Sequence, residues 1–247
     1  TIHLPVTRYH GALQTVRAKT GRFIFTQLDR LLNFSATDQI IFVSQNDMTA
    51  CLQNGLVPAE KTLVIPNGID LAPYRTQKDK ASIRKELILP RDAVILTYVG
   101  RLDEQKGIDV LLDAFSRLPE LEKPCILWVI GDGPLRGDLE KRAGDQIRNN
   151  RIIFWGYRKS VADYLFASDL FILPSLYEAM PLTLLEALAA GLPCIATDVG
   201  DNRILIEPGE NGLIIPPNDA QALQQAILSL LGDPSLRERM KVNNLLK

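Results

Sequence analysis

The sequence predicts an α/β fold built on a doubly wound parallel sheet. From about Asp92 onward, short continuous apolar segments alternate with segments whose apolar residues recur at helical spacing. Strands that are apolar throughout are typical of a parallel sheet covered by helices on both faces. Right-handed crossovers then place a ligand site at the carboxyl ends of the strands. The 247 residues, of which 46% are hydrophobic and 23% charged, suffice for one large domain or two modest ones.

The expected strands of this sheet are six apolar segments, at 93–100, 125–133, 152–156, 169–176, 193–199 and 212–217. Helical spacing occupies the intervals between and after them, at 107–118, 134–146, 161–168, 181–191, 201–206 and 219–233. A charged segment at 75–87 precedes the first of these strands and is interpreted as a solvated surface helix.

The first part of the chain, residues 1–65, contains only three strand candidates, TIHLPV, QIIFVS and TLVIPN. Three parallel strands make a poor free-standing sheet, because their edges and one face would lack cover. We interpret this part as the C-terminal portion of a second Rossmann-like domain whose front half is absent. Residues 66–73, with two prolines and an Asn-Gly pair, are the predicted linker to the domain at 74–247.

Bulk properties exclude several classes of protein. The net charge of -1 argues against nucleic acid as a partner, and no apolar run approaches the ~20 residues of a membrane-spanning helix. Cys51, Cys125 and Cys194 are scattered, which favours small core residues in a reducing cytoplasm over a disulfide framework.

A charged loop follows the first strand of the second domain. Arg101 and Lys106 lie where the strand ends and a helix begins near Gly107, so they could form an anion site with the free backbone N–H groups. The alternative is a pair of exposed basic residues in surface ion pairs with Asp103 and Glu104.

A second polar element occupies residues 175–191. Glu178 lies in a loop after a strand, Pro181 suits the first position of the next helix, and the N–H groups of Leu182 and Thr183 would point toward a ligand. This helix is expected to be buried, so the carboxylate of Glu186 needs a partner such as ligand hydroxyls. The alternative is that Glu186 caps a neighbouring backbone turn.

Several motifs occur in a fixed order: VGRLDEQKG, GDGPL, FWGY, SDLFILPS, EAMPLTLLEA, AAGLPCIATDVG and ENGLIIPPND. Together they resemble the donor domain of retaining glycosyltransferases of the GT-B fold, family 4, the group called glycosyl transferases group 1. IPNGID is similar to the interdomain linker of that family, and TIH to the end of a strand in its acceptor domain. The resemblance covers nearly the whole chain and implies an N-terminally truncated fragment.

The resemblance implies a role for each motif residue. Arg101 and Lys106 would clamp the donor diphosphate, Glu178 would contact the transferred sugar, and Glu186 the ribose hydroxyls. The N–H groups at the start of the helix would bind phosphate. The remaining donor-site residues that it implies are Leu182, Thr183, Met180, Gly100 and Tyr157, with 155–158 bordering the nucleobase, and His3 near the donor sugar.

The implied activity is transfer of a hexosyl group from a nucleotide-diphosphate-sugar to a glycan, lipid-linked or small-molecule acceptor, with retention of configuration. No metal or cofactor is implied, because the nucleotide-sugar is a substrate and the aspartates show no Asp-x-Asp spacing. Two alternatives stay open: a nucleotide-sugar 2-epimerase of the same fold, and a non-catalytic nucleotide-sugar-binding fragment. The expected location is the cytoplasm, with peripheral association of the full-length protein at the inner face of the membrane left open.

Overall fold

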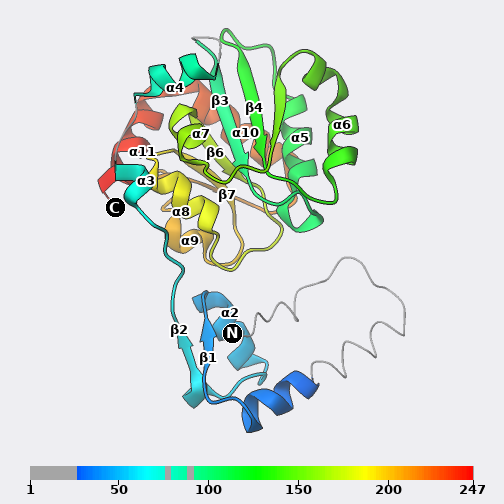
Figure 1. Cartoon of the computed structure of the whole chain (residues 1–247), viewed down its shortest axis with the longest axis vertical. Helices are drawn as coiled ribbons and strands as arrows, with labels where there is room; N and C mark the ends of the chain where they lie inside the picture. The colour runs from blue at the N-terminus through cyan, green and yellow to red at the C-terminus, as the bar shows by residue number, and fades with distance from the viewer. Residues whose placement is uncertain (1–26, 76–78, 88–91, 247) are drawn as a thin grey trace. The chain divides into compact units, whose positions relative to one another are not determined.

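The computed structural model describes residues 27–75, 79–87 and 92–246. The chain divides into two compact units, Thr1–Asn67 and Gly68–Lys247 (Figure 1). This division falls inside the segment 66–73 that the sequence suggests as a linker. The strand expected at TIHLPV lies outside the described residues, as does His3.

The first unit holds a short parallel strand pair. A helix at 27–35 precedes β1 (Ile40–Phe42), α2 (Gln45–Gln53), the 3-10 turn η1 (Ala59–Lys61) and β2 (Thr62–Val64). β1 pairs in parallel with β2, Ile40 opposite Thr62. Ile40, Phe42, Cys51 and Val57 form the small core of this unit.

The second unit contains the parallel sheet that the sequence predicts. Its strands are β3 (Val94–Val99), β4 (Cys125–Ile130), β5 (Ile152–Gly156), β6 (Leu170–Leu173), β7 (Cys194–Thr197) and β8 (Gly212–Ile215). They run in the order β5-β4-β3-β6-β7-β8 with every pairing parallel. The direction of winding reverses between β3 and β6, so the switch point of the sheet lies between these two strands.

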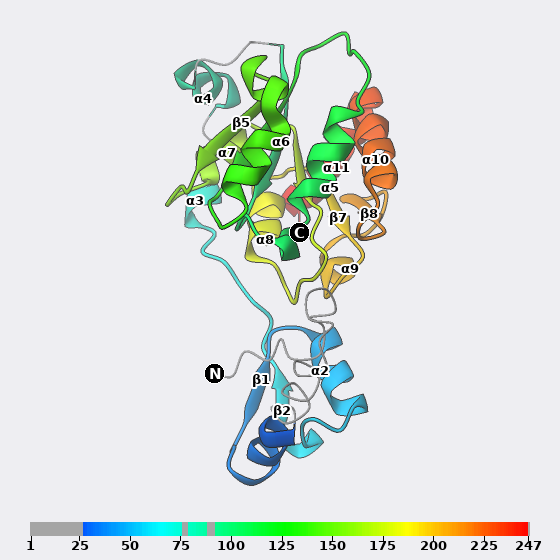
Figure 2. The same cartoon turned by 90° about the vertical axis from the view of Figure 1, so that its right-hand side faces the viewer.

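Helices cover both faces of this sheet (Figure 1, Figure 2). One face carries α5 (Ile108–Ser116), α6 (Arg136–Arg148) and α10 (Ala220–Gly232), and the other carries α3 (Ala72–Arg75), α7 (Ala162–Ala167) and α8 (Leu182–Ala189). The remaining helices are η2 (Glu104–Lys106), α4 (Lys80–Glu86), α9 (Asn202–Leu205) and α11 (Pro234–Leu246).

The period of two in β3 decides which core each side chain joins. Leu96 and Tyr98 point into the core with Phe115 of α5, whereas Val99 packs with Leu184 of α8 on the opposite face. Because both faces are buried, the strand is apolar apart from Thr97, whose hydroxyl pairs with that of Ser168. A nearly continuous apolar segment is the pattern that identified the strand in the sequence.

The segment 75–87 contains the surface helix α4, as the sequence predicts, but one face of this helix is anchored to the rest of the unit. Lys80 donates to Asp169 at 2.7 Å, and Arg84 donates to the other oxygen of the same carboxylate at 2.6 Å. Ile83 is buried. The backbone N–H of Ile95 also donates to Asp169, so a carboxylate at the edge of the sheet holds the helix in place.

The cysteines behave as the sequence predicts, since Cys51, Cys125 and Cys194 are all buried and unpaired. Within the described part of the chain, no helix combines the length and the apolar character that crossing a bilayer requires.

Candidate functional site

Two loops at the carboxyl edge of the sheet carry most of the charged residues that the sequence singled out. The first runs from Arg101 to Gly107 between β3 and α5, and the second from Pro174 to Pro181 between β6 and α8. β3 and β6 are neighbours in the sheet, so the two loops meet at the switch point, where doubly wound sheets bind ligands.

A buried ion pair joins the two loops. The Lys106 ammonium donates to Oε1 of Glu178 at 2.6 Å, and the same oxygen accepts the hydroxyl of Ser175 at 2.7 Å. The Glu178 side chain is only 6% exposed and that of Lys106 20%. Burying a carboxylate at this depth is costly without such partners, and the pair fixes a carboxylate and an ammonium side by side at the sheet edge.

Backbone contacts hold the two loops in register. The side-chain amide of Gln105 donates to the Tyr177 backbone carbonyl at 3.0 Å, and the backbone carbonyl of Gln105 accepts the N–H of Leu176 at 2.8 Å. Gly107 adopts φ 60°, and a Cβ there would lie 2.3 Å from the Pro174 carbonyl oxygen. A glycine is therefore required for the loops to approach this closely.

A third loop, after β7, packs against the backbone of the Glu178 loop. Gly200 has φ 52°, and a Cβ on it would lie 2.1 Å from the Glu178 carbonyl oxygen. The N–H of Asp201 donates to the Ala179 carbonyl, and the Thr197 hydroxyl donates to the Ser175 carbonyl. The loop at 200–203 therefore acts on this site through the backbone of the Glu178 loop.

Arg101 and Lys106 differ in their surroundings. The Arg101 side chain is 70% exposed, and its Nε lies 3.3 Å from Asp103, so the surface ion pair considered as an alternative exists for this residue. The hydroxyl of Tyr98 donates to the Arg101 carbonyl and braces the loop. Lys106 instead points inward to Glu178. The two cations that the sequence suggests as one anion site therefore differ in burial and in partner.

The N-terminus of α8 has no side-chain cap. Pro181 was expected at the first helical position, but its ψ of 122° is extended and makes it the N-cap, so the helix begins at Leu182. The first intrahelical hydrogen bond runs from Leu185 N–H to the Pro181 carbonyl. The N–H groups of Leu182 and Thr183 are consequently without intrahelical partners and form a positively polarised helix end beside the Glu178 loop.

Glu186 has a partner that neither interpretation of the sequence named. α8 is only half buried, with Leu184 and Ala187 inside and Leu182 49% exposed, which corrects the expectation of a buried helix. Burial raises the pKa of Glu186, while a hydrogen bond from the Tyr74 hydroxyl lowers it in part. Burial, together with the Glu186 carboxylate, also raises the pKa of Tyr74 well above its usual value.

The other candidate residues lie along the same edge. Gly100 follows directly after β3, and Met180 is buried in the Glu178 loop. Tyr157 follows β5, is 73% exposed, and lies two strands from β3, about 10 Å along the edge. Among the described residues, no group of three His, Cys, Asp or Glu side chains is placed to hold a metal ion.

Three contacts of this site were missed in the sequence: Ser175 and Gln105 beside Glu178, and Tyr74 beside Glu186. Ser175 ends the motif SDLFILPS and Gln105 lies within VGRLDEQKG, so their place in these motifs was an available signal. Tyr74 had no such signal, because its partner lies on a helix far along the chain.

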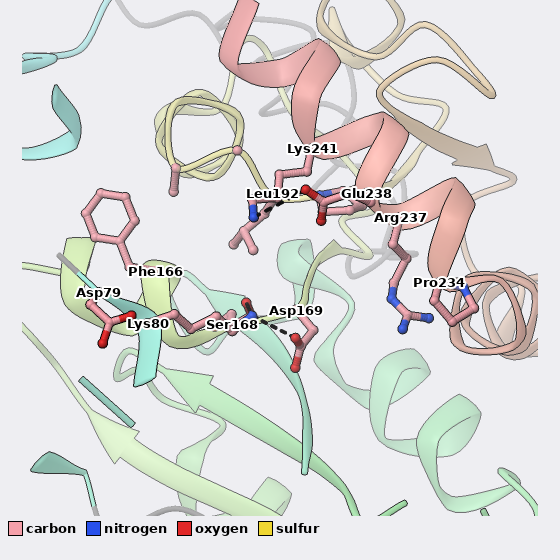
Figure 3. A pocket seen from close by; sticks show the side chains of 13 residues that line it. Asp79, Lys80, Phe166, Ser168, Asp169, Leu192, Pro234, Arg237, Glu238 and Lys241 are labelled. Atoms are coloured by element: carbon pink, nitrogen blue, oxygen red, sulfur yellow. Dashed lines mark hydrogen bonds and ion pairs between the residues drawn. The ribbon is translucent and has the colours of Figure 1, made fainter. Parts of the chain in front are cut away.

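A cavity lies away from this site. It measures about 480 Å³ and lies at the amino edge of the sheet, between α11 and the residues that precede β6 and β7 (Figure 3). Its charged side chains are committed to one another or to the backbone: Lys80 to Asp169, Asp79 to the start of α4, Arg237 to two carbonyls, and Glu238 to Lys241. The cavity therefore offers little uncommitted charge to a ligand.

The fold defines the class of protein. The α/β fold with its parallel sheet is of the GT-B type, and the solved structure of WaaG, a glycosyltransferase involved in lipopolysaccharide biosynthesis, shares it. That structure matches 93% of this chain and 64% of its own, with a TM-score of 0.82 at 22% identity.

The chain belongs to the glycosyl transferases group 1 family, whose sequence model matches residues 79–245. It is 31% identical over 232 residues to an Escherichia coli UDP-Gal:alpha-D-GlcNAc-diphosphoundecaprenol alpha-1,3-galactosyltransferase, covering 92% of this chain and 60% of the relative. The Anabaena HepE structure in complex with UDP-glucose is 25% identical with a TM-score of 0.79, covering 90% of this chain and 61% of HepE. The chain thus spans about three fifths of the length of these relatives.

Proposed function

We propose that this chain is the donor-binding part of a hexosyltransferase that uses a nucleotide-diphosphate-sugar. The observation that carries the proposal is the buried Lys106–Glu178 pair at the switch point, beside the uncapped N-terminus of α8. Pairing an ammonium with a carboxylate suits a substrate whose reacting bond joins an anionic leaving group to a carbon that becomes positive.

The leaving diphosphate is bound by groups of fixed position. An ammonium has three N–H donors, and Lys106 uses one on Glu178, so two remain for phosphate oxygens. The N–H groups of Leu182 and Thr183 and the exposed Arg101 complete the site. These donors stabilise the charge that grows on the diphosphate by preorganised electrostatics, so the reaction needs no divalent cation.

Glu178 acts on the sugar. Its carboxylate is held by Lys106 and Ser175. In this proposal it faces the reacting carbon of the sugar and stabilises the positive charge that develops on the ring. The acceptor attacks from the face that the diphosphate leaves, which gives retention of configuration. Glu186 binds the ribose hydroxyls and contributes to affinity.

Uridine is the base that we propose for the donor, since the Escherichia coli relative is named for UDP-Gal and HepE was solved with UDP-glucose. The name of the same relative includes an undecaprenol-linked acceptor. We extend this to a glycan or lipid-linked acceptor for the whole protein, which would then work at the inner face of the membrane.

Calorimetric titration of the chain with UDP-, GDP- and ADP-glucose in EDTA tests the proposal. We expect UDP-glucose to bind, with an affinity that added magnesium leaves unchanged. Lys106→Met should abolish measurable binding, whereas Lys141→Met, at a side chain 83% exposed on α6, should leave it intact. Absence of binding by all three nucleotide-sugars would contradict the proposed function, and binding that requires magnesium would contradict the metal-independent clamp.

A further inference from the structure

The two side chains that hold Glu178 meet at one oxygen of its carboxylate. The Lys106 ammonium and the Ser175 hydroxyl both donate to Oε1, at 2.6 and 2.7 Å. Among the described residues, these are the hydrogen bonds that the carboxylate accepts. One oxygen of the carboxylate is therefore engaged, and the other, Oε2, is left for a ligand.

We propose that Ser175 is a positioning residue that orients Oε2 of Glu178 toward a hydroxyl of the transferred sugar. This inference rests on the proposed function, because it places the donor sugar beside Glu178. Ser175 acts through the carboxylate and does not itself touch the sugar.

A series of buried hydrogen bonds fixes Ser175 in place. Ser175 follows β6 directly in the loop to α8 and is fully buried. The hydroxyl of Thr197, at the end of β7, donates to the Ser175 carbonyl at 2.6 Å. The side-chain amide of Asn202 donates in turn to the Thr197 carbonyl at 2.9 Å, and both residues are buried. The Ser175 hydroxyl is thus a donor at a fixed point, held from the neighbouring strand and from the loop that follows it.

A second donor is needed because Lys106 alone would not fix the carboxylate. The last torsion of a glutamate side chain has a broad distribution, and the lysine ammonium is a point charge on a flexible stem of four carbons. A carboxylate bound to that ammonium alone could rotate and exchange its two oxygens. The Ser175 hydroxyl removes this freedom, and fixing Oε2 before the sugar arrives lowers the entropy that binding must overcome.

Ser175→Ala removes the hydroxyl and leaves the Lys106–Glu178 pair in place. The probes are UDP and UDP-glucose in calorimetric titration, or the GDP or ADP pair should the parent chain bind one of those instead. We expect the affinity for the nucleotide-sugar to fall about five- to tenfold, as the weakening of one hydrogen bond to a charged group implies. The affinity for the nucleoside diphosphate, which carries no sugar for Glu178 to contact, should change by less than about twofold.

Thr197→Val is a second variant, and it provides the same test independently of whether Ser175→Ala folds. It keeps the branched shape of the side chain and removes the hydroxyl that supports the Ser175 carbonyl. The ratio of the affinity for the nucleotide-sugar to that for the nucleoside diphosphate should fall here also, by about two- to fourfold, because Ser175 keeps its own hydroxyl.

Ser168→Ala is the matched control. Ser168 is a buried serine just before β6, at the opposite end of the same strand, and its hydroxyl lies 2.5 Å from that of Thr97. We expect this variant to lose stability in urea as Ser175→Ala does, while the ratio of the two affinities is unchanged. An unchanged ratio in Ser175→Ala or in Thr197→Val, or an equal decline in Ser168→Ala, would overturn the positioning role alone. Failure of the parent chain to bind UDP-, GDP- or ADP-glucose would overturn the proposed function and this inference with it.

Discussion

Replacing Lys106 by methionine should destabilise the second unit more than the loss of an exposed charge would. The ammonium lies 2.6 Å from Glu178, and at an effective dielectric constant of about 20 the direct attraction is about 6 kcal/mol before desolvation is subtracted. Lys106→Met keeps most of the side-chain volume but leaves Glu178 with Ser175 as its remaining side-chain donor in the described structure. Since breaking a buried pair costs about 3–5 kcal/mol and Lys106 is partly exposed, we expect a loss of about 2–4 kcal/mol.

A double-mutant cycle isolates the pair. Glu178→Gln retains the shape and removes the charge, so Lys106→Met in that background should cost about 1 kcal/mol. The assay is urea unfolding followed by tryptophan fluorescence, because both tryptophans of the chain, Trp128 and Trp155, lie in the second unit. The two rings pack edge to face at 5.6 Å, so their emission reports the unfolding of this unit.

The coupling energy between the two substitutions tests whether Lys106 and Glu178 form a buried interaction. We expect the two substitutions to be non-additive by about 2 kcal/mol. The opposite finding, additive costs or a Lys106→Met loss below about 1 kcal/mol, would mean that the pair is not a buried interaction and that the electrostatic basis of the site is wrong.

Three further predictions follow from other parts of the second unit. Gly107→Ala should lower the free energy of unfolding by at least about 2 kcal/mol, because the residue has positive φ and a Cβ would lie 2.3 Å from a carbonyl of the adjacent loop. The control is Gly137→Ala on α6, where a Cβ meets nothing within 4 Å. It should be neutral or stabilising in the same urea assay. In the complete enzyme, Glu178→Gln should lower kcat while leaving UDP binding nearly unchanged, whereas Glu186→Gln should weaken binding of any nucleotide; equal losses of UDP affinity would remove this division of roles. Asp169→Asn should destabilise the unit at pH 7, since burial favours a higher pKa but two cations hold the pKa of this carboxyl below its usual value. A carboxyl whose pKa is depressed by folding contributes stability above its unfolded pKa, so the cost of the substitution should shrink as the pH falls below about 4. A cost that does not change with pH in thermal melts would contradict the role of Asp169 as the charged partner of the two cations.

The sheet could be predicted because its signal is local. Each strand of the second unit is a continuous apolar segment, and burial on both faces is what makes such a segment continuous. The charged loops could also be placed, since parallel strands end at one edge and the residues after β3 and β6 must therefore meet there.

The contacts that give each charge its environment could not be predicted. The sequence of α4 indicates a charged surface helix and does not show that Asp169 lies against it. The sequence also does not show which residue of α3 lies near Glu186 of α8. Pro181 suits both the N-cap and the first helical position by its φ, and only its ψ of 122° distinguishes them. For α4 and Glu186 the deciding contact joins residues that are distant in sequence. For Pro181 the deciding quantity is one backbone torsion that the sequence leaves open.

Where UDP binds is the most direct test of the account. Backbone amide chemical shifts, recorded by NMR during titration of the chain with UDP in EDTA, would locate the site on the second unit. The account predicts that the largest shifts fall at 100–107 and 175–186, at the carboxyl edge of the sheet. Shifts centred instead on 168–169 and 237–241, which border the cavity at the amino edge, would contradict it.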